Sequence, residues 1–156
     1  PQIVNDLEYL LKEGMFKIGL SSEIHDFSQL HVAYRLASIA LEYGPIADNT
    51  SCCYYFRDCA LDYLSRKVCE DISSDYLCAG EIRTLRSYDE KHNTKLNETL
   101  ETYLTLERNV VQTAKALYIH RSTLFYRLDR IIQITGLDLN NPRTRLYLLM
   151  SYQILK

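Results

Sequence analysis

The most regular pattern of apolar positions lies in the C-terminal half of the chain, between Asn109 and Gly136. Apolar residues recur there at helical spacing in two runs, separated by a break at 118–120. Asn109 suits an N-cap, with Gln112 in the capping-box position, and Gly136 suits a C-cap. The pattern predicts a short helix, a tight turn and a longer helix over 121–135.

The longer helix has two chemically different sides. At about 100° per residue, Leu124, Leu128, Ile131 and Thr135 fall on one side, which we expect to face a core. The opposite side carries hydroxyl, amide and guanidinium groups, which suit the base edges and phosphates of a DNA major groove. The candidate DNA contacts on this helix are Arg121, Ser122, Thr123, Tyr126, Arg127 and Arg130.

Two of these residues are the expected base readers, Arg130 and Ser122, because Arg bonds two guanine acceptors at once and Ser reaches base edges. An ordinary amphipathic hairpin of helices would show the same periodicity, with an arginine-rich side that is only solvated. His120 lies in the turn, where we expect its ring to cap the longer helix rather than to bind a phosphate.

The residues that fill this pattern resemble known DNA-binding motifs. The spacing TAxxLxIxRxTLxxxL, from Thr113 to Leu128, is similar to the Fis-type helix-turn-helix. Residues 119–150 contain His-Arg-Ser-Thr-Leu followed by Tyr-Arg-Leu, and resemble the C-terminal helix-turn-helix of PucR/CdaR-type bacterial transcriptional regulators. Residues 96–104 resemble the helix that precedes the motif in that family. Tyr118 is a departure from general helix-turn-helix motifs, in which Gly often occupies the turn.

The N-terminal part of the chain predicts a strand–helix–strand unit. We expect a helix over 5–12, a strand over 16–20, a helix that Asp26 caps and that stops at Gly44-Pro45, and a strand over 52–56. The many small residues of the second helix indicate close packing. Two such strands normally need a third strand between or beside them, so the rest of the sheet is expected to be missing from the sequence.

A looser resemblance covers part of this unit. Residues 17–41 resemble the second half of the degenerate cyclase-like (GGDEF-like) domain that precedes the helix-turn-helix in PucR/CdaR regulators. That domain is generally not catalytic, and no Gly-rich phosphate loop stands in this stretch. The resemblance implies a partial cyclase-like remnant and contributes no active-site residues.

Further helices are predicted between the two halves and at the end of the chain. The apolar spacing indicates helices over 57–70, 76–88 and 94–106, and the polar stretch 89–93 is the expected linker. Asn141-Pro142 is a strong start signal for a last helix that is apolar on almost every side. The inward residues expected in the N-terminal half include Tyr34, Leu61, Leu64 and Val68.

These elements together predict a mainly α fold. It consists of a C-terminal helix-turn-helix bundle, preceded by helices and by a small strand–helix–strand remnant of a cyclase-like domain. The expected domains are the remnant over residues 1–56, connecting helices over 57–92 and the helix-turn-helix DNA-binding domain over 93–156.

Composition places the chain among soluble globular proteins, with 47% hydrophobic and 24% charged residues in a length of 156. No apolar run approaches membrane-spanning length and no signal peptide is visible, so we expect a cytoplasmic protein with no membrane partner. The chain begins at Pro1 rather than at a methionine, and we expect it to be part of a longer protein.

Nothing in the sequence favours catalysis or metal binding. The five cysteines form no C-x-x-C pair and are expected to be free thiols, while the four histidines are scattered without metal-ligand spacing. No nucleophile-elbow motif is present. We therefore expect no enzyme activity, no metal and no cofactor.

Charge is distributed unevenly along the chain. Residues 93–156 hold nine Lys or Arg against five Asp or Glu, a net of +4, whereas residues 1–92 hold nine against fifteen, a net of −6; the two sum to the −2 of the whole chain. Positive charge in the segment that holds the motif is what phosphate contacts require, although the excess is modest.

The sequence thus predicts a sequence-specific DNA-binding transcriptional regulator, with the helix over 121–135 in the major groove of double-stranded DNA and two copies acting as a homodimer. The alternative is a helical protein-interaction module without DNA binding. The resemblance implies that the full-length regulator senses an effector metabolite, which we expect an upstream region outside this chain to bind.

Overall fold

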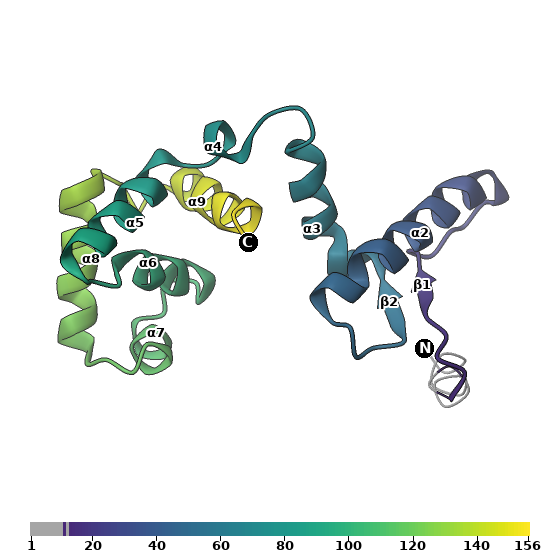
Figure 1. The fold of residues 1–156 in the computed structure, drawn as a ribbon, viewed down its shortest axis with the longest axis horizontal. Helices are drawn as coiled ribbons and strands as arrows, with labels where there is room; N and C mark the ends of the chain where they lie inside the picture. The colour runs from purple at the N-terminus through teal and green to yellow at the C-terminus, as the bar shows by residue number, and fades with distance from the viewer. Residues whose placement is uncertain (1–10, 12) are drawn as a thin grey trace. The chain divides into compact units, whose positions relative to one another are not determined.

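The computed structural model describes residues 11 and 13–156, which fall into two compact units (Figure 1). Unit 1 is Pro1–Val68 and unit 2 is Cys69–Lys156. The helix predicted over 5–12 lies outside the described residues except for Leu11. Within the described part, none of the helices combines the length and the apolarity that crossing a membrane would need.

Unit 1 contains the predicted strand–helix–strand. Its two strands pair directly and in parallel, with Ile18 opposite Cys53 and Leu20 opposite Tyr55. In the described residues they form a two-stranded sheet. The elements in order are β1 (Ile18–Leu20), the 3-10 turn η1 (Phe27–Gln29), α2 (Leu30–Ala47), β2 (Cys53–Tyr55) and α3 (Phe56–Val68).

Two glycines allow α2 to lie close to the strands. A Cβ on Gly19 would stand 2.0 Å from the carbonyl oxygen of Ala37, and one on Gly44 would stand 2.3 Å from the ring of Tyr54. The predicted stop at Gly44-Pro45 is wrong, because α2 continues to Ala47. Gly44 is therefore a contact residue under the Tyr54 ring and does not end the helix.

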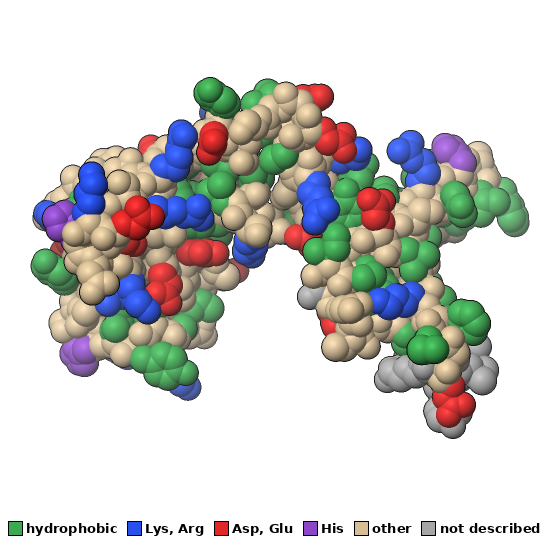
Figure 2. All heavy atoms as spheres, in the orientation of Figure 1, with side chains coloured by type: hydrophobic (Ala, Val, Ile, Leu, Met, Phe, Trp, Pro, Cys, Tyr) green, Lys and Arg blue, Asp and Glu red, His purple; other side chains and the backbone are tan. Residues whose placement is uncertain are grey.

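The apolar residues of unit 1 are less buried than the sequence predicts. Leu61, Leu64 and Val68 of α3 were expected to face inward but are 66%, 54% and 48% exposed, and Tyr34 of α2 is 73% exposed. Hydrophobic side chains are accordingly visible on this unit's surface (Figure 2). The buried cluster instead consists of Ala40, Tyr43, Tyr54 and Cys59.

Unit 2 is entirely helical in its regular elements, so the fold of the chain is mainly α, as predicted. The helix predicted over 76–88 is two helices, and the expected linker 89–93 is wrong, because α5 runs through His92 and ends at the left-handed residue Asn93 (φ 52°). The helices are α4 (Ser74–Leu77), α5 (Gly80–His92), α6 (Leu96–Thr105), α7 (Val110–Ala116), α8 (Arg121–Thr135) and α9 (Pro142–Ile154).

One core joins α5, α6, α8 and α9. Its fully buried side chains come from all four helices, and Ala114 of α7 joins them at 5% exposure. This burial confirms the inner side that was predicted for α8, the helix over 121–135. The largest fully buried members of the core are Ile82, Leu85, Leu100, Leu124, Ile131 and Leu148.

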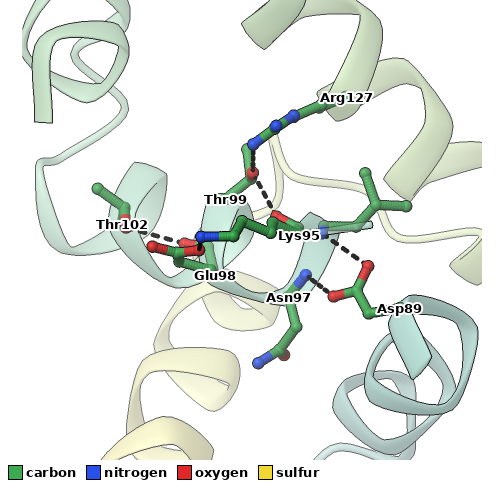
Figure 3. A network of polar contacts seen from close by, with 8 residues as sticks. Asp89, Lys95, Asn97, Glu98, Thr99, Thr102 and Arg127 are labelled. Atoms are coloured by element: carbon green, nitrogen blue, oxygen red, sulfur yellow. Dashed lines mark hydrogen bonds and ion pairs between the residues drawn. The ribbon is translucent and has the colours of Figure 1, made fainter. Parts of the chain in front are cut away.

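Three polar side chains connect these helices at their ends. Asp89 of α5 accepts hydrogen bonds from the backbone N–H groups of Leu96 and Asn97, both at 2.8 Å, and so caps α6 from outside (Figure 3). Ser151 of α9 accepts the N–H of Ala79, at the start of α5, at 2.9 Å. Tyr152 donates to the Asn97 side chain at 3.0 Å, and burial raises the pKa of this phenol, which therefore stays neutral.

The bond between Ser151 and Ala79 generates a stability prediction. Ser151 is 1% exposed, so Ser151→Ala leaves the Ala79 N–H buried without its partner, and we expect a loss of about 1–3 kcal/mol in the free energy of unfolding. Urea denaturation followed by circular dichroism measures it. Ser87→Ala, on an exposed position of α5, is the matched control and should stay within about 0.5 kcal/mol of the unchanged protein. Equal effects of the two changes would contradict this account.

Candidate nucleic-acid interface

The candidate interface is built on α7, the turn after it and α8. The N-cap of α7 is Asn109, as predicted, and its side-chain oxygen accepts the N–H of Gln112 at 3.1 Å. Thr113 is fully buried and donates to the Asn109 carbonyl at 2.7 Å. With Ala114 also buried, the small residues of α7 let α8 pack against it.

The turn between the helices is held by local hydrogen bonds. The Ile119 N–H donates to the Ala114 carbonyl at 3.0 Å, and Ile119 packs against the core as predicted. His120 caps α8, because its Nδ1 accepts the N–H of Ser122 at 3.3 Å and lies 2.8 Å from the Ser122 hydroxyl. The capping role predicted for His120 is thus confirmed.

The first two turns of α8 present their polar side to solvent. Leu124 is fully buried on the core side, whereas Arg121, Ser122 and Thr123 are exposed and Tyr126 is 70% exposed. Two neighbours that the sequence reasoning did not single out share this surface: Phe125 is 53% exposed, and Asp129 is exposed one turn further along. The surface offers hydroxyl, guanidinium and aromatic groups, followed by a carboxylate.

The other two candidate arginines are half-buried and engaged within the molecule. Arg127 donates through Nη1 to the hydroxyl of Thr99 on α6 at 3.1 Å (Figure 3). Arg130 donates through Nε and Nη2 to the Tyr88 hydroxyl at 3.2 and 3.0 Å, and through Nη1 to Gln133 at 3.1 Å. The hydrogen bond to Tyr88 raises the pKa of Arg130 further, so the guanidinium keeps its charge.

A hollow of about 420 Å³ brings part of the predicted set together. Thr123, Tyr126, Arg127 and Arg130 line it from α8, whereas Arg121 and Ser122 lie outside it. Two further lining residues, Lys95 and Tyr88, were missed by the sequence reasoning. Lys95 lies inside the helix predicted over 94–106, whereas in the structure it precedes α6, and no local pattern places Tyr88 beside α8.

Other basic residues of unit 2 serve its loops. Arg145 donates to the carbonyls of Leu139 and Asn140 at 2.9 and 2.6 Å, and Arg108 reaches the same two residues at 3.4 and 3.3 Å. These arginines therefore hold the loop before α9. On the face of unit 2 drawn in Figure 2, Lys, Arg, Asp and Glu are interspersed, so the surface has no single broad basic patch there.

The cysteines are free thiols, and burial raises the pKa of both Cys59 and Cys78. Raised thiol pKa values disfavour the reactive thiolate. Across residues 11 and 13–156, no group of three or more His, Cys, Asp or Glu side chains is arranged to hold a metal ion.

The helices of the candidate interface match a known protein family. Residues 96–154, which span α6 to α9, match the family described as the PucR C-terminal helix-turn-helix domain. They are a PucR-type helix-turn-helix domain. In this PucR-type domain, α7 and α8 are the two helices of the motif and α8 occupies the place of the recognition helix.

Homology to PucR/CdaR regulators extends beyond the domain itself. The carbohydrate diacid regulator of Escherichia coli is 32% identical over 139 residues, which cover 89% of this chain and 35% of that protein. The purine catabolism regulatory protein of Bacillus subtilis is 29% identical over 139 residues, covering 87% of this chain and 25% of that protein. The chain thus spans about a third or less of the length of these relatives.

A second relative from Bacillus subtilis matches a shorter stretch of the chain at higher identity. The proline-responsive transcriptional activator PutR is 36% identical over 76 residues, which cover 49% of this chain and 18% of that protein. All three relatives carry the names of regulators or activators.

The turn of the PucR-type domain generates a backbone prediction. Tyr118 has a left-handed φ of 54° and a 96% exposed side chain, so its Cβ strains the backbone and its ring gains no packing. Tyr118→Gly is expected to raise the free energy of unfolding by about 1 kcal/mol. Tyr118→Ala, which keeps the Cβ, should stay within about 0.5 kcal/mol of the unchanged protein.

At the end of α8, a substitution at Gly136 is expected to change the free energy of unfolding in the opposite direction. Gly136 has a φ of 68°, and a Cβ there would meet no atom within 4 Å. Gly136→Ala should therefore lower the free energy of unfolding by about 1 kcal/mol, through backbone strain alone. Thermal or urea unfolding of the three variants side by side measures these shifts. A stabilising Gly136→Ala, or a Tyr118→Ala as stable as Tyr118→Gly, would refute the backbone explanation.

Proposed function

We propose that this chain is the DNA-binding part of a transcriptional regulator that inserts α8 into the major groove of double-stranded DNA. The observation that best supports this proposal is the exposure of Arg121, Ser122, Thr123 and Tyr126 on a helix whose opposite side is locked in the core. In helix-turn-helix proteins the first residues of the second helix contact base edges. The names of the homologous regulators point the same way.

The chemistry of these residues suits base and backbone contacts. Arg121 can bond the O6 and N7 acceptors of guanine, and the hydroxyls of Ser122 and Thr123 reach either bases or phosphates. Phe125 provides an apolar contact for a thymine methyl group. The Asp129 carboxylate on the third turn would be repelled by phosphates, which favours entry of the first two turns rather than the whole length of α8.

The proposal extends to the assembly and to the rest of the protein. We propose that two copies act as a homodimer with their recognition helices about one DNA turn apart, in the cytoplasm and without catalytic activity. Unit 1 is proposed to include a cyclase-like remnant over residues 1–56, with residues 57–92 connecting it to a DNA-binding domain over 93–156. An effector metabolite is proposed to bind a region of the longer regulator outside these residues.

One surface of unit 2 is suited to the homodimer. On α9, Leu148 and Tyr152 are buried, but Leu146 and Met150 are 60% and 54% exposed. Leu149, between them, is 36% exposed. An exposed apolar helix face of this kind gains free energy when a second copy covers it.

The DNA-binding proposal predicts a selective loss at Arg121. A preferred duplex is first identified by sequencing the genomic DNA fragments that the immobilised protein retains. Arg121→Ala should weaken binding to this selected duplex by about 1–3 kcal/mol, and should weaken binding to mixed genomic DNA less. Fluorescence anisotropy at two salt concentrations measures both affinities. Arg83→Ala, which removes an exposed arginine from α5, is the control and should change neither.

Binding by the unchanged protein must fall steeply with salt, because phosphate contacts release counterions. Absence of DNA binding, or DNA binding that is insensitive to salt, would contradict the DNA-binding proposal. It would favour the alternative of a protein-interaction module.

The homodimer proposal predicts a charge-sensitive α9. Met150→Glu should shift the full chain toward the monomer in sedimentation-velocity experiments, because a carboxylate would be buried in the proposed contact. Leu61→Glu places the same charge on a 66% exposed position of unit 1 and should leave the distribution unchanged. A monomeric unchanged protein, in the presence and absence of the selected duplex, would exclude the homodimer.

A further inference from the structure

The hollow beside α8 has a different character from the exposed first turns of that helix. Its walls come from Tyr88 at the end of α5, from residues 93–96 and from four residues of α8. Thr123, Tyr126, Arg127 and Arg130 follow one another at helical spacing along one flank of α8. The hollow is therefore continuous with the outer side of the recognition helix, which Thr123 and Tyr126 also form.

Three cations meet in this hollow, and no carboxylate lines it among the described residues. Lys95, Arg127 and Arg130 each contribute a positive charge. Two acidic side chains contact residues of the lining, Asp89 through backbone N–H groups and Glu98 through Lys95 itself. Both oxygens of Asp89 accept backbone N–H groups of α6, and Glu98 pairs with Lys95 at 3.4 Å. That pair is solvent-exposed on both sides, so it is weak and can open to admit an anion.

The two guanidinium groups are held in place by buried or half-buried oxygens. Thr99, which is fully buried, accepts from Arg127 and donates to the Lys95 carbonyl at 2.6 Å, so its hydroxyl has a fixed direction (Figure 3). Tyr88 fixes Arg130 by accepting from two of its nitrogens, with the guanidinium carbon 5.4 Å from the ring centroid. These bonds leave further N–H donors on both arginines for a ligand.

The shape of the site selects the kind of ligand. Base edges lie recessed inside a DNA groove, whereas phosphates protrude from the duplex, so a hollow on the flank of a recognition helix is reached by phosphates. Arginine forks, an ammonium group and the hydroxyls of Thr123 and Tyr126 match the oxygens of a singly charged phosphodiester. A preorganised set of donors also costs less side-chain entropy on binding.

We propose that the hollow lined by Lys95, Thr123, Tyr126, Arg127 and Arg130 binds one phosphodiester group of the DNA backbone beside the groove that receives α8. This inference rests on the proposed DNA-binding function and deepens it. It assigns Arg130 to the backbone, in place of the sequence-based expectation that Arg130 reads a base. Tyr88 and Thr99 are positioning residues, since they act through the two arginines.

The first test is the salt dependence of full-chain variants. Arg130→Gln should weaken the selected duplex and mixed genomic DNA by the same factor, and should reduce the slope of log affinity against log salt by about 1. Lys95→Gln, at an exposed side chain that the core does not need, should do the same. Arg83→Gln is the matched control outside the hollow and should leave the slope unchanged. Circular dichroism of each variant confirms folding.

The second test locates the phosphate. Single methylphosphonate groups, which are uncharged, are placed along the backbone of the selected duplex. The unchanged protein should lose affinity at one position in each half-site, and Arg130→Gln should lose nothing further at that position. Tyr88→Phe keeps the ring but removes the hydroxyl that holds Arg130, so it should lower affinity less than Arg130→Gln does.

The outcomes separate this site from the proposed function. If the unchanged protein binds no DNA, the proposed function fails and the site fails with it. If the unchanged protein binds but Arg130→Gln keeps the full salt slope, or loses affinity only for the selected duplex, the phosphodiester site alone is overturned. It is also overturned if inorganic phosphate raises the melting temperature of the unchanged protein but not of Arg130→Gln, while both bind DNA equally.

Discussion

The burial of one side of α8 is the constraint on which the rest of unit 2 depends. Leu124 and Ile131 are fully buried among side chains of α5, α6 and α9, and each such side chain contributes about 1.5–3 kcal/mol. Their spacing allows only one rotation of the helix about its axis. That rotation decides that Arg121 and Ser122 face solvent, and it brings Arg127 and Arg130 alongside Thr99 and Tyr88.

Elements whose limits are set by local chemistry could be predicted from the sequence. The bounds of α8 follow from the His120 cap and from Gly136, and the start of α9 follows from Asn141 and Pro142. Local chemistry also explains why residues 89–93 were wrongly predicted to be a linker. Asp89 is polar because it caps the next helix, seven residues ahead in sequence, and no rule of composition distinguishes such a cap from a loop residue.

Positions that depend on the tertiary neighbourhood could not be predicted in this way. Leu61 and Leu64 have the spacing of an inner face, but α3 buries Cys59 and packs through Tyr63. Of the candidate interface, the exposed residues of α8 could be derived from helical periodicity. The partners of its arginines could not, because Tyr88 is 42 residues away from Arg130 and Thr99 is 28 away from Arg127.

The exposed start of α8 and its anchored third turn differ in what they can recognise. A phosphate is the same at every step of a duplex, so a site at Arg130 would set where the protein sits without favouring any sequence. Arg121, Ser122 and Phe125, which lie outside that site, would then be the part that distinguishes one operator from another. Substitutions among them could redirect such a regulator to new genes during evolution, while its docking on the duplex stayed as it was.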